Sequence, residues 1–116
     1  YKRQAKECGV HQNYKNKVLK ANDIATMSTG KRLGHPVRSI KNPYTKEYFK
    51  LEYSNISDEE LEAYGRGSLY RAAVEGDEKT GCFLAGQIAG MVNKEQTCKE
   101  MIVEMMDQAE TLLGRK

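Results

Sequence analysis

The segment Gly81-Cys-Phe-Leu-Ala-Gly-Gln-Ile-Ala-Gly-Met-Val-Asn93 is the least polar stretch of this 116-residue chain. Its glycines and alanines leave one side clear of bulk, which allows a backbone or a flat ligand to approach closely. Gln87 is the single polar side chain between Gly81 and Gly90, and its amide offers donors and an acceptor. Either this surface receives a planar ring, or its small residues let a helix pack tightly on a neighbour; composition alone favours the second interpretation. The small residues concerned are Ala85, Gly86, Ala89 and Gly90.

The composition indicates one domain, which we expect to span residues 1–116 as a single helical lobe. The chain is 39% hydrophobic and 30% charged, with a net charge of +3, and it is far too short for a (β/α)8 barrel of about 250 residues. The 19 basic and 16 acidic residues are mixed along most of the sequence, unlike the concentrated basic face of a nucleic-acid-binding protein. Because the chain begins at Tyr1 and its first residues read as the middle of a protein, we expect a fragment.

The cysteine pattern predicts a cytoplasmic protein without a metal site. Cys8, Cys82 and Cys98 are odd in number and contain no C-x-x-C pair, which argues against a disulfide framework and against zinc. The sequence also lacks an apolar run of the roughly 20 residues that cross a bilayer, and it lacks the apolar core of a signal peptide. We therefore expect neither a membrane nor a nucleic acid as partner.

The first half of the chain predicts one helix, a hairpin and a second helix. Apolar residues recur at helical spacing over 11–21. Segments 24–29 and 36–41 are rich in β-branched residues and flank a glycine turn, so they predict two short strands. Asn42 and Pro43 then end the second strand, because proline lacks the N–H that a ladder needs, and a helix follows over 45–53.

The second half predicts four more helices, which makes the fold mainly α with a small two-stranded β element. Capping boxes at 57–60 and 97–100 each begin a helix, and the second of these opens the longest helix of the chain. A helix over 68–75 is expected to bury Leu69, Ala72, Ala73 and Val74, and another is expected over 84–92. Four methionines at helical spacing are expected to fill the core rather than to form a pliant binding groove. They are Met91, Met101, Met105 and Met106.

Four segments together resemble the C-terminal part of a known family. They are His11-Gln-Asn-Tyr-Lys-Asn-Lys-Val-Leu-Lys-Ala-Asn-Asp23, Gly34-His-Pro-Val-Arg-Ser-Ile-Lys-Asn42, Ala73-Val-Glu-Gly-Asp77 and Leu84-Ala-Gly-Gln-Ile-Ala-Gly90. In order and approximate spacing they are similar to the FMN-dependent enoyl-[acyl-carrier-protein] reductases of type II and to their relatives, the nitronate monooxygenases (2-nitropropane dioxygenase-like). The similarity runs from about Glu7 to the end of the last helix.

The resemblance implies a lobe that covers the FMN site of a TIM barrel, with the barrel itself missing from this chain. Ala85, Gly86 and Gln87 match the motif that lies against the isoalloxazine, and His35 and Arg38 fall in a lid that faces the substrate opening. The family's catalytic histidine lies in a barrel loop that this chain lacks, so we expect no catalytic residue here. FMN is the implied cofactor, with NADH or NADPH as donor. The implied partners are the missing barrel domain or a second copy of the chain, and an acyl-carrier protein.

Several alternatives stay open at this point. Leu84 stands where the reductases often carry methionine, His11 and His35 suit capping or solvent-exposed roles, and Cys82 suits a small buried apolar residue. The complete protein would reduce an enoyl thioester or oxidise a nitronate. The third alternative is a non-enzymatic helical interaction module that pairs with itself through the small-residue face.

Overall fold

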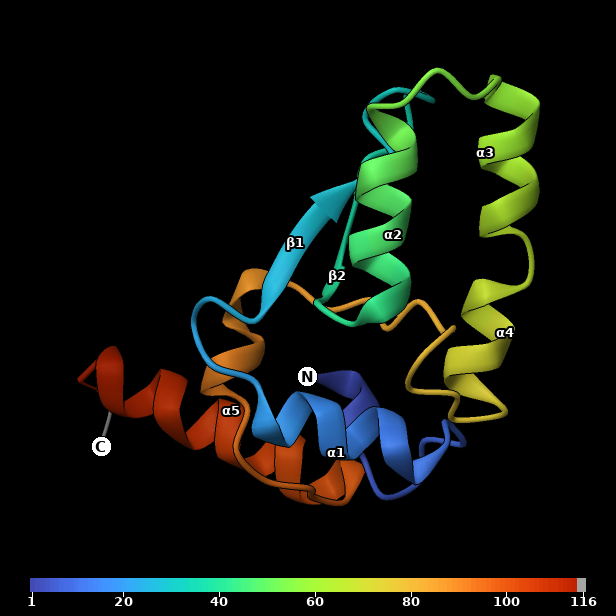
Figure 1. Cartoon of the computed structure of the whole chain (residues 1–116). Helices are drawn as coiled ribbons and strands as arrows, with labels where there is room; N and C mark the ends of the chain where they lie inside the picture. The colour runs from blue at the N-terminus through green and yellow to red at the C-terminus, as the bar shows by residue number, and fades with distance from the viewer. Residues whose placement is uncertain (115–116) are drawn as a thin grey trace. The chain divides into compact units, whose positions relative to one another are not determined.

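The computed structural model describes residues 1–114 and shows a mainly helical chain with one two-stranded antiparallel sheet (Figure 1), which confirms the predicted fold class. The elements in chain order are η1 (Lys2–Gln4), α1 (Gln12–Lys20), β1 (Thr26–Thr29), β2 (Val37–Ile40), α2 (Pro43–Glu52), α3 (Asp58–Gly65), α4 (Ser68–Ala73), η2 (Gln87–Met91) and α5 (Cys98–Leu112). Contacts divide the chain into two compact units, one formed by Val10–Asn93 and the other by Tyr1–Gly9 with the residues from Lys94 onward. The expectation of a single lobe stays a prediction.

The predicted hairpin is confirmed, and the sheet gains a short third segment. Thr26 pairs with Ile40 and Thr29 with Val37 across the antiparallel β1 and β2. On β2, Ile40 N donates to Phe83 O at 2.8 Å and Arg38 O accepts from Ala85 N at 3.1 Å. The backbone of 83–85 is therefore extended beside β2, with an isolated antiparallel bridge between Ser39 and Leu84.

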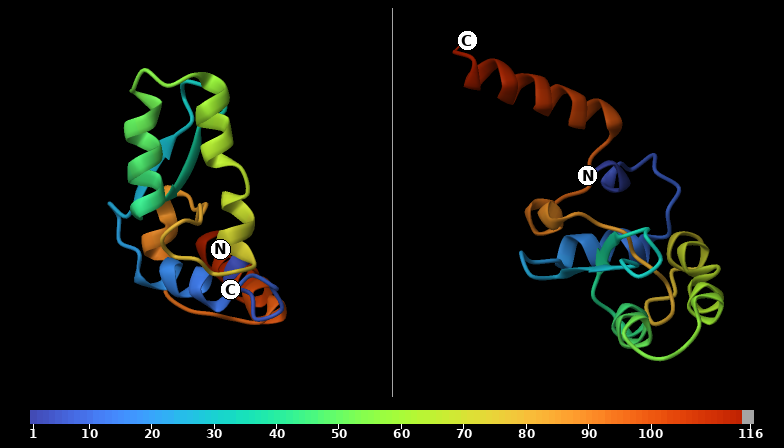
Figure 2. Two further views of the ribbon diagram at one scale, coloured as in Figure 1. Left: turned by 45° about the vertical axis from the view of Figure 1, so that its right-hand side comes forward. Right: turned by 90° about the horizontal axis from the view of Figure 1, so that it is seen from above.

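The two faces of this small sheet cover separate hydrophobic clusters, because side chains alternate along extended backbone. Ile40 and Phe83 pack with Tyr14 and Val18 of α1 in one cluster. Cys82 and Leu84 belong to the other, which α2 and α3 complete with Tyr44, Tyr48 and Leu61. Helices α2 and α3 lie side by side (Figures 1 and 2), so they form one wall of the second cluster.

The helix starts follow local chemistry. The ring of His11 caps α1 by accepting from Asn13 N at 3.0 Å, which confirms its expected capping role. Helix α2 begins two residues earlier than predicted, at Pro43, where proline's fixed φ suits the first helical position. Asn42 and Thr45 form its capping box. Both predicted capping boxes, at the starts of α3 and α5, are confirmed.

The predicted helix over 84–92 is wrong. Leu84 and Ala85 are extended beside β2, and only Gln87–Met91 forms a 3-10 turn. Sheet pairing uses the backbone groups that a helix would need, and the glycines weaken helical propensity. Helix α4 is shorter than expected and, although Ala72 is fully buried, Leu69 and Val74 are more than half exposed, so their predicted burial is also wrong.

The methionine prediction is correct only for Met101, which is buried in the unit that contains α5. Met91, Met105 and Met106 are exposed, because helical spacing reveals an apolar face without showing that anything covers it. Within the described part of the chain, no helix combines the length and apolar character needed to cross a bilayer.

Candidate functional site

The segment predicted to contact a flavin is held firmly up to Ala85 and then becomes exposed. The side-chain amide of Asn42 donates to Gly81 O at 2.7 Å, and the Tyr14 hydroxyl donates to Leu84 O at 2.6 Å. The bond from Ala85 N to Arg38 O fixes the next residue. Gly86 and Gln87 follow at the surface, where η2 begins. A fixed backbone therefore presents a short exposed edge.

Close packing requires two of the three glycines in this segment but not the third. A Cβ atom on Gly81 would lie 2.8 Å from the backbone of Ala72, and one on Gly90 would lie 2.6 Å from the carbonyl carbon of Asn22. A Cβ on Gly86 would meet nothing within 4 Å, and its φ of −78° is open to any residue. Neither packing nor conformation within the described residues requires glycine at position 86.

Gln87 offers hydrogen bonds that the described chain does not use. Its side chain is exposed at the first position of η2. No group within residues 1–114 hydrogen-bonds to its amide. An exposed carboxamide beside an open backbone edge can donate to a heteroatom of a planar ring and accept from its N–H groups.

A cavity of about 220 Å³ lies on the second face of the sheet, between the hairpin and helices α2 and α4. It brings His35 together with Cys82 and Leu84, although these residues are far apart in the sequence. Its lining comprises Thr29, Gly30, His35, Val37, Tyr44, Tyr48, Gly65, Ser68, Leu69, Cys82 and Leu84. No sequence pattern indicated this cavity beyond the four-residue spacing of Tyr44 and Tyr48, which placed both rings on one helical face.

Burial favours the neutral forms of two phenols and one thiol in the cavity. Burial raises the pKa of Tyr44 to about 12, against the opposing effect of its hydrogen bond with Ser68. Burial also raises the pKa of Tyr48. Burial raises the pKa of the Cys82 thiol, and the Ser39 hydroxyl offsets part of that rise. Cys82 is only 5% exposed, which agrees with a small buried apolar residue rather than a nucleophile.

The two predicted lid residues, His35 and Arg38, do not converge. His35 is exposed and lines the cavity. Val37 on β2 lines the same cavity. Arg38 follows it directly, and because side chains alternate along a strand, the Arg38 side chain lies on the other face of the sheet. There its guanidinium donates to Thr26 Oγ1 at 3.2 Å. The sequence placed these residues in one segment without showing that they serve opposite faces.

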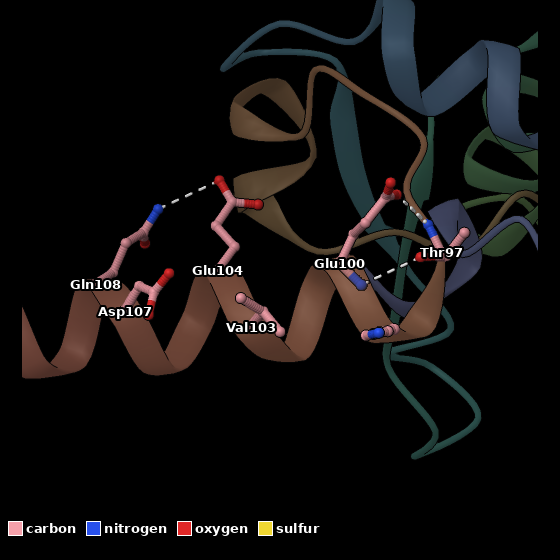
Figure 3. A pocket seen from close by; sticks show the side chains of 7 residues that line it. Thr97, Glu100, Val103, Glu104, Asp107 and Gln108 are labelled. Carbon is pink, nitrogen blue, oxygen red and sulfur yellow. Dashed lines mark hydrogen bonds between the residues drawn. The ribbon is translucent and has the colours of Figure 1, made fainter.

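A second concavity, in the other unit, runs along the polar side of α5 (Figure 3). It is lined by Thr97, Lys99, Glu100, Val103, Glu104, Asp107 and Gln108. Several of its polar groups already have partners: Thr97 and Glu100 form the capping box, and Glu104 accepts from Lys94, Gln96 and Gln108. One helix supplies every lining residue, so this hollow lacks the converging walls of a ligand site.

The described residues also contain no group of three or more His, Cys, Asp and Glu side chains that could hold a metal ion. Cys8, Cys82 and Cys98 are free thiols. The exposed edge at Gly86 and Gln87, together with the cavity beside Leu84, is therefore the site that the geometry supports.

Comparison with known proteins agrees with the resemblance found in the sequence. The family model described as nitronate monooxygenase matches residues 4–108. The structure of FabK from Thermotoga maritima is similar with a TM-score of 0.84 and 35% identity, over 98% of this chain and 37% of the FabK chain. The M276A mutant of FabK from the same organism matches with a TM-score of 0.71 and 31% identity, over 98% of this chain and 35% of that chain.

This chain thus spans little more than a third of the length of those solved proteins. The match of the family model over nearly all described residues nevertheless confirms the family. The chain belongs to the nitronate monooxygenase family.

Proposed function

We propose that this chain forms the flavin-facing wall and substrate lid of an FMN-dependent oxidoreductase that uses NADH or NADPH to reduce an enoyl thioester on acyl-carrier protein. The observation that carries the proposal is Gly86, an exposed glycine that nothing within residues 1–114 requires. Close contact between backbone and a planar ring requires a position without a side chain. The similarity to FabK and the family match support the same lineage.

The residues around Gly86 fit an isoalloxazine ring. Ala85 is fixed by β2 and presents little bulk, while the Gln87 amide is available for the polar edge of the ring. No side chain adds charge at positions 85–87. In this proposal Gly86 permits contact and Gln87 orients the ring.

When bound, FMN supplies the hydride chemistry between the nicotinamide and the substrate double bond. This chain's part is to bind the flavin ring and to exclude water from it. His35 at the cavity rim belongs to the lid. We propose that the missing barrel domain supplies the phosphate cradle and the catalytic histidine. The isolated chain is then inactive, and tight FMN binding with robust NADH turnover by the 116-residue chain would overturn the proposal.

The test uses the complete protein that contains this segment. Gly86→Leu is expected to weaken FMN retention at least tenfold, measured as flavin bound after gel filtration, because the new side chain occupies the ring's position. Gly9→Leu is the matched control, because a Cβ on Gly9 also meets nothing within 4 Å but lies in the other unit. Equal FMN retention in both variants would contradict the flavin wall.

Nitronate oxidation by the same flavin architecture is the second candidate, favoured by the description of the matching family model. The two reactions separate cleanly in an assay. An enoyl-thioester reductase consumes NADH or NADPH in step with the loss of the double bond, whereas a nitronate monooxygenase consumes oxygen with a nitronate and needs no nicotinamide.

The non-enzymatic module finds less support. Its small-residue face required Ala85, Gly86, Ala89 and Gly90 on one helix, but Ala89 is buried and Gly90 closely approaches Asn22. If Gly86→Leu abolishes self-association of the chain in analytical ultracentrifugation without affecting flavin retention, the module replaces the flavin wall.

A further inference from the structure

We propose that the cavity between the hairpin and helices α2 and α4 receives the aliphatic tail of the thioester substrate and limits its length. This inference rests on the proposed flavin wall at Gly86 and Gln87. It adds a second subsite on the same face of the chain, built by residues that the flavin contact does not use.

The position of the cavity follows from the extended backbone at 82–86. Cys82 and Leu84 both line the cavity, while Phe83 between them packs in the opposite cluster. Gly86 also has extended backbone angles, so its open side lies toward Leu84 and the cavity. A substrate whose double bond lies against a ring at Gly86 has this cavity beside it.

The chemistry of the walls favours a neutral, apolar ligand. Most of the surface that faces the cavity is apolar, and no Asp, Glu, Lys or Arg side chain contributes to it. The hydroxyl of Tyr44 stays protonated and is already bonded to Ser68. A carboxylate or phosphate would lose its water there without a compensating cation. An alkyl chain has no hydrogen bonds to water to give up on entry, and it gains contact with the tyrosine rings.

The size of the cavity suits a short chain. Its volume of about 220 Å³ equals roughly seven water molecules at about 30 Å³ each. The inner wall is stiff, because the Tyr44 and Tyr64 rings stack with centroids 5.4 Å apart and an interplanar angle of 2°. Leu69 on α4 lines the cavity while remaining 53% exposed, which places it at the mouth.

The experiment measures binding of acyl-N-acetylcysteamine thioesters to the 116-residue chain by calorimetry. Each methylene that enters an apolar site tightens binding by about fourfold at most, so the octanoyl thioester is expected to bind at least tenfold more tightly than the butanoyl thioester. Leu69→Trp, which fills the mouth, is expected to weaken octanoyl binding at least tenfold and to leave butanoyl binding within twofold.

Val74→Trp is the matched control, since Val74 ends the same helix, is 55% exposed and does not line the cavity. The thiol of Cys82 reports the location: in a chain with Cys8→Ser and Cys98→Ser, octanoyl thioester at saturation should slow alkylation of Cys82 by N-ethylmaleimide at least fivefold. Affinity without chain-length dependence, equal effects of both tryptophans, or unprotected Cys82 would each overturn the inference.

These outcomes are separable from a failure of the flavin wall. If Gly86→Leu loses FMN while the tryptophan variants do not differ, the tail subsite is wrong and the flavin wall stands. If the chain-length dependence and the Cys82 protection hold while Gly86→Leu keeps its FMN, the cavity binds alkyl chains as inferred and the flavin wall is wrong.

Discussion

Gly86 and Gly90 stand four residues apart in one segment, yet the structure constrains them in opposite ways. We expect Gly90→Ala to destabilise the chain by about 1–3 kcal/mol, because its Cβ would lie 2.6 Å from the Asn22 carbonyl carbon and the neighbouring backbone must move. Gly86→Ala should be neutral or should stabilise by up to about 1 kcal/mol, since its φ and the surrounding space accept alanine. Urea unfolding of the two variants measures the difference, and equal midpoints would contradict it.

Tyr44 makes the stability of the folded chain depend on pH above about 10. Its pKa in the folded state is about 12 against 10.0 in a free tyrosine, so folding favours the protonated phenol. This contribution is fully present below pH 10 and is lost as the pH rises from 10 to 12. We expect stability to fall across that window in the native chain and to fall less in Tyr44→Phe, as measured by urea unfolding at a series of pH values. An unchanged pH profile in Tyr44→Phe would contradict the assignment.

At the residue scale, the sequence marked residues 85–87 as a triplet expected to contact flavin but could not distinguish the glycines of the surrounding segment. Gly81, Gly86 and Gly90 look equivalent in the sequence. Only the fold shows that two of them meet backbone from Ala72 and Asn22, while the third meets open space. Asn22 lies far along the chain from Gly90, and Ala72 approaches Gly81 only because the chain turns back between them, so the local pattern carries no sign of either contact.

The failure over 84–92 shows what local sequence lacks at the scale of an element. Ala85, Ala89 and Val92 recur at a spacing that suits a helix, but Ser39 and its neighbours on β2 bind the backbone of 83–85. Pairing with a distant strand overrides propensity in this way. The capping boxes at Ser57 and Thr97 were predictable because all of their contacts lie within four residues.

Helix α5 depends on its cap to an unusual degree, since Met101 is its only buried residue among those described. We expect Thr97→Ala to destabilise the start of the helix by about 1 kcal/mol, because Glu100 N loses its bond to the Thr97 hydroxyl. Thr111→Ala is the control in the same helix: its hydroxyl bonds Asp107 O one turn back, and alanine is the better helix former there. Amide exchange in the first turn of α5 should quicken only in Thr97→Ala.

The turn of the hairpin is tied to the α2–α3 connection through Arg32. Its guanidinium donates to Asp58 at 2.8 Å and to the carbonyl groups of Ser54 and Ile56. We expect Arg32→Ala to destabilise the chain by about 1 kcal/mol, because the side chain is partly exposed and each bond competes with water.

The effect of Arg32→Ala should concentrate at the hairpin. Hydrogen exchange of His35 N, which bonds Gly30 O at 3.1 Å, should quicken more than that of Ile40 N. Lys50→Ala is the control, because its ion pair with Glu47 is long, at 3.8 Å, and exposed. Uniform quickening of exchange across β1 and β2 in Arg32→Ala would contradict a local tie.

At the scale of the whole molecule, the hydrophobic clusters are unevenly distributed between the two units. Both clusters, and the candidate site with them, consist of residues within Val10–Asn93. In the other unit, the buried apolar side chains are those of Ala5 and Met101 among the described residues. The sequence could not predict this division, because Ile102, Met105 and Met106 carry the same periodic signal as a covered helix.

The division predicts that Val10–Asn93 folds by itself. A chain cut to these residues keeps both clusters, the hairpin and the caps of α1, α2 and α3. We therefore expect its melting temperature to differ from that of the 116-residue chain by no more than roughly 4–8 °C, the shift that corresponds to about 1 kcal/mol in a domain of this size. Near-ultraviolet circular dichroism should keep the signal of the packed Tyr14, Tyr44 and Tyr48 rings. The complementary peptide over 94–114 should lose most of its helix, since a helix of 15 residues is marginal in water without packing. A non-cooperative melt of the shortened chain would show instead that the clusters need the remaining residues.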